Sequence, residues 1–232
     1  SIPKEVKEFF HVDKGQTLLI KGMPGTGKTT LALEIMSSLC EERNGIYIST
    51  REDPARLYAT NPWIEKVLMP RNVVNATQTK LLGSLNKTSK DLSNYYAVMD
   101  FFRVFFAETE EMDNPMIIID SWDAVLNYTS HLIGTSQHSF EQNICEFARD
   151  LDTHLVFVSE FADVMPLDYI VDGVVTMEQF NLPGHAGGNM RNRYVRQIKL
   201  EKLRGVKINQ KTYTVTLHNG RFRFFEPYRE HN

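Results

Sequence analysis

Eight residues near the start of the chain constrain its fold more than any other feature. Residues 22–29 read Gly-Met-Pro-Gly-Thr-Gly-Lys-Thr and fit the pattern G-x-x-x-x-G-K-[ST]. The run before them, 16–20, is short and mostly apolar like a buried strand, and residues 30–42 carry apolar side chains at helical spacing. A strand, a glycine-rich loop and a helix in this order are the setting in which the pattern binds the phosphates of a nucleotide.

The residue types of this loop suit an anionic ligand. Glycines let the backbone curl so that successive N–H groups point at phosphate oxygens, and the following helix adds the positive end of its dipole. We expect Lys28 to act in catalysis on the β- and γ-phosphates of ATP and the Thr29 hydroxyl to bind Mg²⁺. The residues predicted to contact ATP are Gly22, Pro24, Gly25, Thr26, Gly27, Lys28, Thr29 and Thr30.

Further along the chain, strand-like and helix-like segments alternate. Short apolar runs predict strands at 46–48, 116–119 and 154–159. Apolar residues recurring every three or four positions predict helices at 91–111 and 136–150. The aromatic stripe of the first of these helices is typical of core packing rather than of a cofactor site.

From residue 171 onward the pattern changes to a run of strands. They are expected at 171–177, 194–203, 213–217 and 222–225, with a tight turn at Asn219-Gly220. Apolar strands alternating with helices indicate a parallel sheet covered by helices, which the last strands would extend in antiparallel fashion. We therefore predict an α/β fold, with a mostly parallel sheet flanked by helices and C-terminal antiparallel strands, in a single domain over residues 1–232.

Composition excludes several classes of protein. Apolar residues make up 42% and charged residues 24% of the chain, which argues against disorder, a collagen-like fibre and a coiled coil. The two cysteines, Cys40 and Cys145, lack the spacing of a disulfide scaffold or a zinc site. The longest aliphatic runs are too short to cross a bilayer, and no secretory pattern opens the chain. We expect a cytoplasmic protein that does not bind membranes.

The net charge of −3 is unevenly distributed. Residues 191–232 hold 11 Lys and Arg against 3 Asp and Glu, a balance of +8, which leaves −11 for the first 190 residues. An acidic body with a basic tail favours self-association or an anionic ligand held by the tail. A solvated basic hairpin accounts for the same charges.

Asp120 follows the apolar run 116–119. In open α/β sheets ligands bind at the carboxyl ends of the strands, so this carboxylate would face the phosphate loop. It is the second predicted Mg²⁺ ligand beside Thr29, and such a carboxylate usually acts through a metal-bound water molecule.

A nucleotide hydrolase also needs a group that activates water. Residues 49–54, Ser-Thr-Arg-Glu-Asp-Pro, follow the second predicted strand, and Glu52 is the candidate base with Asp53 in reserve. An equally supported interpretation is that both carboxylates cap a helix that starts near Pro54.

Two cations stand two residues apart in the segment 199–205, Lys-Leu-Glu-Lys-Leu-Arg-Gly. In a strand, Lys202 and Arg204 would project from one face. There they could act in catalysis on the γ-phosphate held by a neighbouring subunit, as an arginine finger does. A solvated basic strand explains the pattern as well.

The phosphate loop, the Asp120-Ser121 strand end and the 199–205 segment together resemble the RecA/RadA superfamily, above all its KaiC-like ATPases, which are common in archaea. Residues 213–227 also look like the end of a KaiC-type domain. The resemblance implies a RecA-like core with ATP and Mg²⁺ held between adjacent subunits of a homo-oligomer, expected to be a hexameric ring. It also implies that Lys202 and Arg204 act on the neighbour's nucleotide.

One position departs from this family. KaiC-type domains carry two adjacent glutamates at the end of the second strand, and the matching residues here are Arg51 and Glu52. The replaced glutamate is also the position of the single catalytic glutamate in RecA-type proteins. Either Glu52 suffices, or hydrolysis is very slow and the chain is a nucleotide-dependent switch or scaffold.

A recombinase-type DNA-binding ATPase is a further alternative. The resemblance puts the DNA-binding loops near 127–137 and 161–169, and neither stretch contains Lys or Arg, which phosphate contacts require. The basic candidates are instead Arg191, Arg193 and Arg196. We therefore do not expect a nucleic-acid partner, while an unidentified protein partner stays open.

Overall fold

The computed structural model describes residues 2–12, 14–40, 44–77, 94–133, 137–186 and 189–225. The helices are α1 (Lys4–Phe10), α2 (Lys28–Leu39), α3 (Pro54–Thr60), η1 (Pro62–Lys66), η2 (Pro70–Asn72), α5 (Asn94–Thr109), α6 (Trp122–Ile133), α7 (Gln137–Asp150) and α8 (Leu167–Ile170). The strands are β1 (Thr17–Lys21), β2 (Gly45–Ser49), β3 (Val73–Asn75), β4 (Met116–Asp120), β5 (His154–Ser159), β6 (Gly173–Ala186), β7 (Asn189–Leu203), β8 (Thr212–His218) and β9 (Arg221–Phe225).

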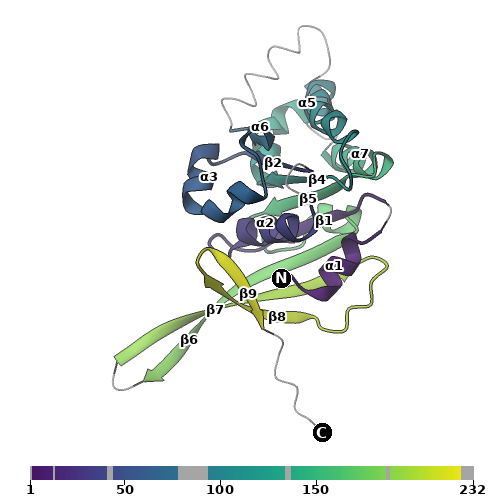
Figure 1. Cartoon of the computed structure of the whole chain (residues 1–232). Helices are drawn as coiled ribbons and strands as arrows, with labels where there is room; N and C mark the ends of the chain where they lie inside the picture. The colour runs from purple at the N-terminus through teal and green to yellow at the C-terminus, as the bar shows by residue number, and fades with distance from the viewer. Residues whose placement is uncertain are drawn as a thin grey trace.

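Within these residues the strands form one sheet in the order β3-β2-β4-β5-β1-β6-β7-β8-β9 (Figure 1). All pairs from β3 to β6 are parallel, and all pairs from β6 to β9 are antiparallel. Helices carry the chain back between the parallel strands, whereas turns suffice between antiparallel ones. The predicted fold class is therefore confirmed.

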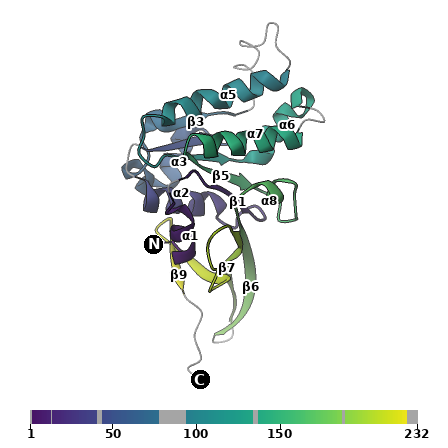
Figure 2. The same ribbon diagram turned by 90° about the vertical axis from the view of Figure 1, so that its right-hand side faces the viewer.

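Helices cover the parallel half of the sheet on both faces. Helices α5, α6 and α7 lie on one face and α1 and α2 on the other (Figures 1 and 2). Successive residues of β4 alternate accordingly: Ile117 and Ile119 pack with the first group and Ile118 with the second. The described part of the aromatic stripe on α5, Phe102 and Phe106 included, is buried in the core as predicted.

The hairpin of β6 and β7 is longer than the sequence indicates. The strands pair from Gly173 with Leu203 to Ala186 with Asn189, beyond the predicted strand ends at 177 and 194 and through Pro183. The pairing of β6 with β1 covers only Leu18 to Lys21, so the outer part of β6 has one partner. An edge of this kind tolerates a proline where the missing N–H would point away from the paired strand.

One further expectation needs correction, and one helix was not predicted. The stretch 127–137, expected to hold a DNA-binding loop, belongs to a helix up to Ile133, since α6 follows directly on β4. Helix α1, which the sequence did not indicate, buries Val6, Phe9 and Phe10 against the sheet. Among the described helices, none combines the length and the apolar character needed to cross a membrane.

Candidate nucleotide site

The phosphate loop connects β1 to α2 and depends on its glycines. Gly25 and Gly27 have φ angles of +82° and +101°, in the left-handed region, and α2 begins directly after Gly27. A Cβ atom on Gly27 would also lie 2.6 Å from the ring of Phe222 on β9. The loop therefore needs glycine both for its conformation and for the close approach of the C-terminal strand.

Lys28 lies folded back across this loop. Its Nζ atom donates a hydrogen bond to the carbonyl oxygen of Met23 at 3.0 Å, and the Thr26 hydroxyl donates to the same oxygen at 2.9 Å. Burial lowers the pKa of Lys28, while the nearby carboxylates of Glu160 and Asp120 oppose that shift. The ammonium group is thus desolvated and surrounded by loop backbone, where a phosphate would provide a better partner than a carbonyl.

Thr29 and Asp120 meet at the carboxyl end of the sheet, as predicted. The Thr29 hydroxyl donates to Asp120 Oδ2 at 2.6 Å, and the Tyr47 hydroxyl donates to the same atom at 2.8 Å. Burial raises the pKa of Asp120, and these two hydrogen bonds oppose the shift. A hydroxyl and a carboxylate oxygen are hard ligands that fit Mg²⁺, with water and phosphate completing its shell.

A cavity of about 280 Å³ opens over the loop. Of the predicted site residues, it is lined by Pro24, Gly25, Gly27, Lys28, Thr29, Thr30 and Asp120. Its remaining walls are Glu160, Arg196, Leu217 and Phe222, none of which had been assigned to the site. Gly22 and Thr26 shape the loop without lining the cavity.

The last hairpin reaches the cavity because it is fastened to α2. Arg221 of β9 donates to both carboxylate oxygens of the buried Glu34 at 2.9 and 2.8 Å, and its guanidinium lies 4.5 Å from the ring centre of Trp63. The Trp63 indole donates to the carbonyl of Gly220 at 3.1 Å. These contacts hold Phe222 against Gly27. In the sequence, the predicted turn at Asn219-Gly220 was the feature nearest to these residues.

The three residues 51–53 at the end of β2 point in different directions. Glu52 does not line the cavity, and its nearest cation is Arg56 at 3.9 Å. The carboxylate of Asp53 caps α3 by accepting from the Ala55 N–H at 2.9 Å, as the capping interpretation predicts. Arg51 instead forms an ion pair with Glu160, which follows β5.

Neither Lys202 nor Arg204 lines the nucleotide cavity of its own chain. Lys202 pairs with Val174 across the sheet and donates to the Asp168 carbonyl at 2.7 Å. Arg204 lies just beyond the end of β7, not within a strand as expected, and contacts Asp172 at 2.6 Å. Burial and the neighbouring Arg204 lower the pKa of Lys202. Asp172 also accepts a hydrogen bond from the Thr17 hydroxyl. Thr17 is the first residue of β1, whereas the phosphate loop follows the last residue of that strand.

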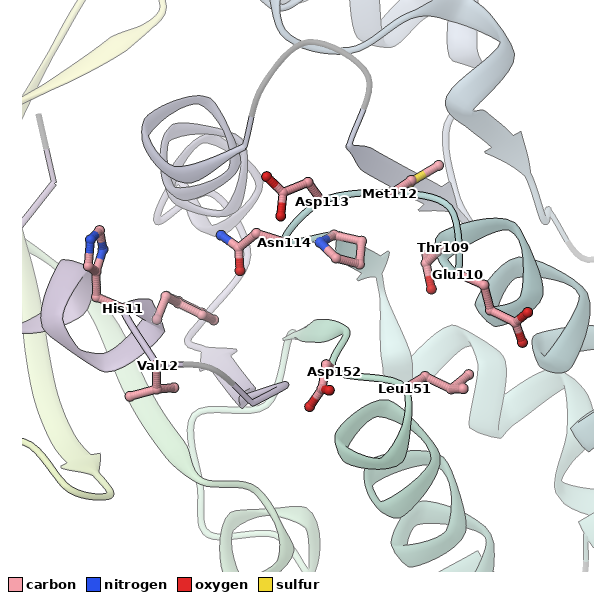
Figure 3. Close-up of a pocket in the computed structure, with 11 residues that line it drawn as sticks. His11, Val12, Thr109, Glu110, Met112, Asp113, Asn114, Leu151 and Asp152 are labelled. Carbon is pink, nitrogen blue, oxygen red and sulfur yellow. The ribbon is translucent and has the colours of Figure 1, made fainter.

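A larger hollow of about 600 Å³ lies at the other end of the sheet (Figure 3). It is bordered by the end of α1 at His11, by Glu110 and Asp113 after α5, and by Asp152 after α7. Figure 3 shows these side chains spread around the rim without meeting at one point. No predicted site residue lies there.

Comparison with known proteins agrees with this geometry. The family described as "GvpD gas vesicle protein, P-loop domain" matches residues 6–201. Protein GvpD2 of Halobacterium salinarum is 32% identical over 228 residues, and GvpD1 of the same organism is 28% identical over 231. The matches cover 97% of this chain but only 44% and 41% of those proteins. The chain thus spans less than half the length of these curated relatives.

A solved structure extends the comparison to the fold. The crystal structure of a KaiC-like protein from Pyrococcus horikoshii matches with a TM-score of 0.65 and 16% identity, over 92% of this chain and 91% of that one. At this identity the match shows the fold, a RecA/KaiC-like P-loop fold, as the resemblance implied.

Proposed function

The chain belongs to the GvpD P-loop domain family, and from this premise we propose that it binds ATP with Mg²⁺ and hydrolyses it between the subunits of a homo-oligomer. Its family and its fold are those of a nucleotide-binding P-loop protein. The observation that carries the finer proposal is the cavity in which Lys28, Thr29 and Asp120 converge. Thr29 and Asp120 would hold Mg²⁺, which supplies charge neutralisation at the β- and γ-phosphates.

The test is ATP hydrolysis across a protein concentration series, with Lys28→Ala as the blank. A rate per subunit that rises with concentration and saturates supports a site shared between subunits. A rate that exceeds the blank but stays constant from the most dilute sample upward contradicts sharing.

The oligomeric part of the proposal rests on the placement of Lys202 and Arg204, which contact α8 and Asp172 rather than their own cavity. A mixing experiment tests it. Lys28→Ala subunits keep Arg204, and Arg204→Ala subunits keep the phosphate loop, so a mixture of two inactive variants should regain activity at shared interfaces. No recovery, with both variants folded and assembled, contradicts the trans role.

A nucleotide-dependent switch with little hydrolysis is the second candidate, and the Arg51–Glu160 ion pair favours it. Such a switch works only if ATP binds one assembly state more tightly than another. Wild-type protein would then bind ATP and shift its assembly state while turning over near the Lys28→Ala blank. Turnover at a rate typical of RecA-like enzymes would contradict it.

A further inference from the structure

Two opposite charges meet at the mouth of the nucleotide cavity. Arg51 follows β2 and Glu160 follows β5, and these strands flank β4, which ends in Asp120. Glu160 lines the cavity together with Lys28 and Asp120, whereas Glu52 does not. Their side chains are 45% and 30% exposed, so the pair is open to a ligand that enters the cavity.

The side chain of Asp123 holds the backbone at Glu160 in place. The carboxylate of Asp123, itself buried, accepts from the Glu160 N–H at 2.6 Å and from the Ser159 hydroxyl at 2.7 Å. A buried carboxylate with both oxygens engaged at the end of β5 holds the start of the Glu160 side chain at the cavity wall. Glu160 also lies close enough to Lys28 for its charge, together with that of Asp120, to oppose the lowering of the lysine pKa by burial.

We propose that Glu160 is the carboxylate that activates the attacking water, and that Arg51 restrains it until a γ-phosphate draws Arg51 away. The inference rests on the proposed ATP site. In the step, the water oxygen forms a bond to the γ-phosphorus while Glu160 takes a proton from that water. The bond from the γ-phosphorus to the bridging oxygen breaks, its electron pair stays on ADP, and the proton later leaves Glu160 for solvent.

Charge competition explains the restraint. While Arg51 is paired with Glu160 Oε1, its guanidinium competes with the attacking water molecule for this carboxylate. A γ-phosphate offers the guanidinium two oxygens in the bidentate geometry that arginine prefers. ADP lacks this phosphate, so the ion pair re-forms after release. The pair therefore makes the site respond to ATP and not to ADP.

Glu160→Gln tests the base. General-base catalysis contributes about 10²- to 10⁴-fold, so kcat should fall at least about 100-fold while ATP affinity does not fall. Glu178→Gln is the matched control, because Glu178 is 32% exposed and pairs with one cation, Lys199, outside the cavity. Glu52→Gln is measured alongside, and a larger loss of kcat there than in Glu160→Gln overturns the proposal.

Arg51→Met tests the restraint, with binding as a readout independent of turnover. We expect kcat to rise several-fold, ATP affinity to fall about tenfold and ADP affinity to stay constant, because only ATP carries the phosphate that Arg51 contacts. Arg51→Lys should keep part of the preference for ATP, since it retains a point charge without the planar fork. The double variant with Glu160→Gln should keep the low kcat of the single Gln variant.

The remaining outcomes also decide the matter. If wild type and Arg51→Met bind ATP but neither exceeds the Lys28→Ala blank, Glu160 is not a restrained base, although the proposed ATP site stands. If Arg51→Met lowers kcat, the restraint is wrong. If wild type binds no ATP, the inference and the proposed function fail together.

Discussion

The parallel and the antiparallel half of the sheet build the nucleotide cavity in different ways. Strands β1, β4 and β5 end at the cavity and deliver the phosphate loop, Asp120 and Glu160 from their carboxyl ends. The antiparallel strands approach from the side and add Arg196, Leu217 and Phe222 along their length. The parallel half thus supplies the groups proposed to bind phosphate and Mg²⁺, from the carboxyl ends of its strands. The antiparallel half supplies a side wall of the cavity, whose position depends on the contacts between the last hairpin and α2.

Lys28→Ala should break the parallel half most strongly. Removal of the ammonium group that the phosphate loop folds around should weaken ATP binding by about a thousandfold, or roughly 4 kcal/mol, because its charge-assisted hydrogen bonds to phosphate are lost. Titration calorimetry with ATP measures the loss. An affinity within tenfold of wild type would show that the phosphates lie elsewhere.

Acid should destabilise the parallel half through His154 at the start of β5. Burial lowers the pKa of this imidazole to about 4, and its Nδ1 accepts from the Gln16 N–H at 3.0 Å. The unfolded chain binds this proton from about pH 6.5 downward and the folded chain only near 4. Stability should therefore fall by about 3 kcal/mol between those values.

Denaturant titrations from pH 7 to 4 measure this loss in wild type and in His154→Gln, which cannot titrate. The variant should show the smaller decline. Parallel curves for the two proteins would assign the acid sensitivity to other groups.

Glu34→Gln should detach the antiparallel wall from α2. It replaces one of the two carboxylate oxygens that accept from Arg221 with an amide NH₂, which cannot accept, and it should cost about 2 kcal/mol because the Glu34 side chain is 1% exposed. Affinity for ATP should fall as well, since Leu217 and Phe222 reach the cavity through this contact. Thermal unfolding and calorimetry measure both, with Glu178→Gln as the exposed control. If the variant loses stability but keeps its affinity for ATP, the antiparallel wall does not contribute to nucleotide binding.

Arg196→Met should produce the smallest effect and sharpen the comparison. Arg196 on β7 lines the cavity, so it should contact the bound nucleotide as one charge among several and contribute about 1 kcal/mol, or roughly a fivefold change in ATP affinity. A matched Arg103→Met variant on α5 should bind ATP like wild type. Equal affinities for all three proteins would remove Arg196 from the site.

The same comparison explains what the sequence could predict. The phosphate loop is a local pattern, and Asp120 follows from where a strand ends, so both were found and the structure brings them together. Tyr47 was missed because a tyrosine inside an apolar strand carries no signal of its own. Arg196 and Phe222 reach the loop only through the register of antiparallel strands far along the chain.

The end of β2 shows a different limit. The residues 51–53 are adjacent, and sequence alone could not tell which side chain faces the cavity. The backbone turn sends Arg51 to Glu160, leaves Glu52 beside Arg56, and uses Asp53 as a helix cap. The role of Glu52 as base stays a prediction, as does the trans role of Lys202 and Arg204.

The contact between Trp63 and the last hairpin gives the protein a fluorescent reporter. The chain has two tryptophans. Trp122 is fully buried and stacks on Phe140 at a ring distance of 5.7 Å. The Trp63 ring contacts the guanidinium of Arg221, and its indole N–H donates to the Gly220 carbonyl. Both residues lie close in sequence to Phe222, which approaches Gly27 of the phosphate loop. The emission of Trp63 therefore reports, without any added dye, how the hairpin sits over the loop as ligands come and go.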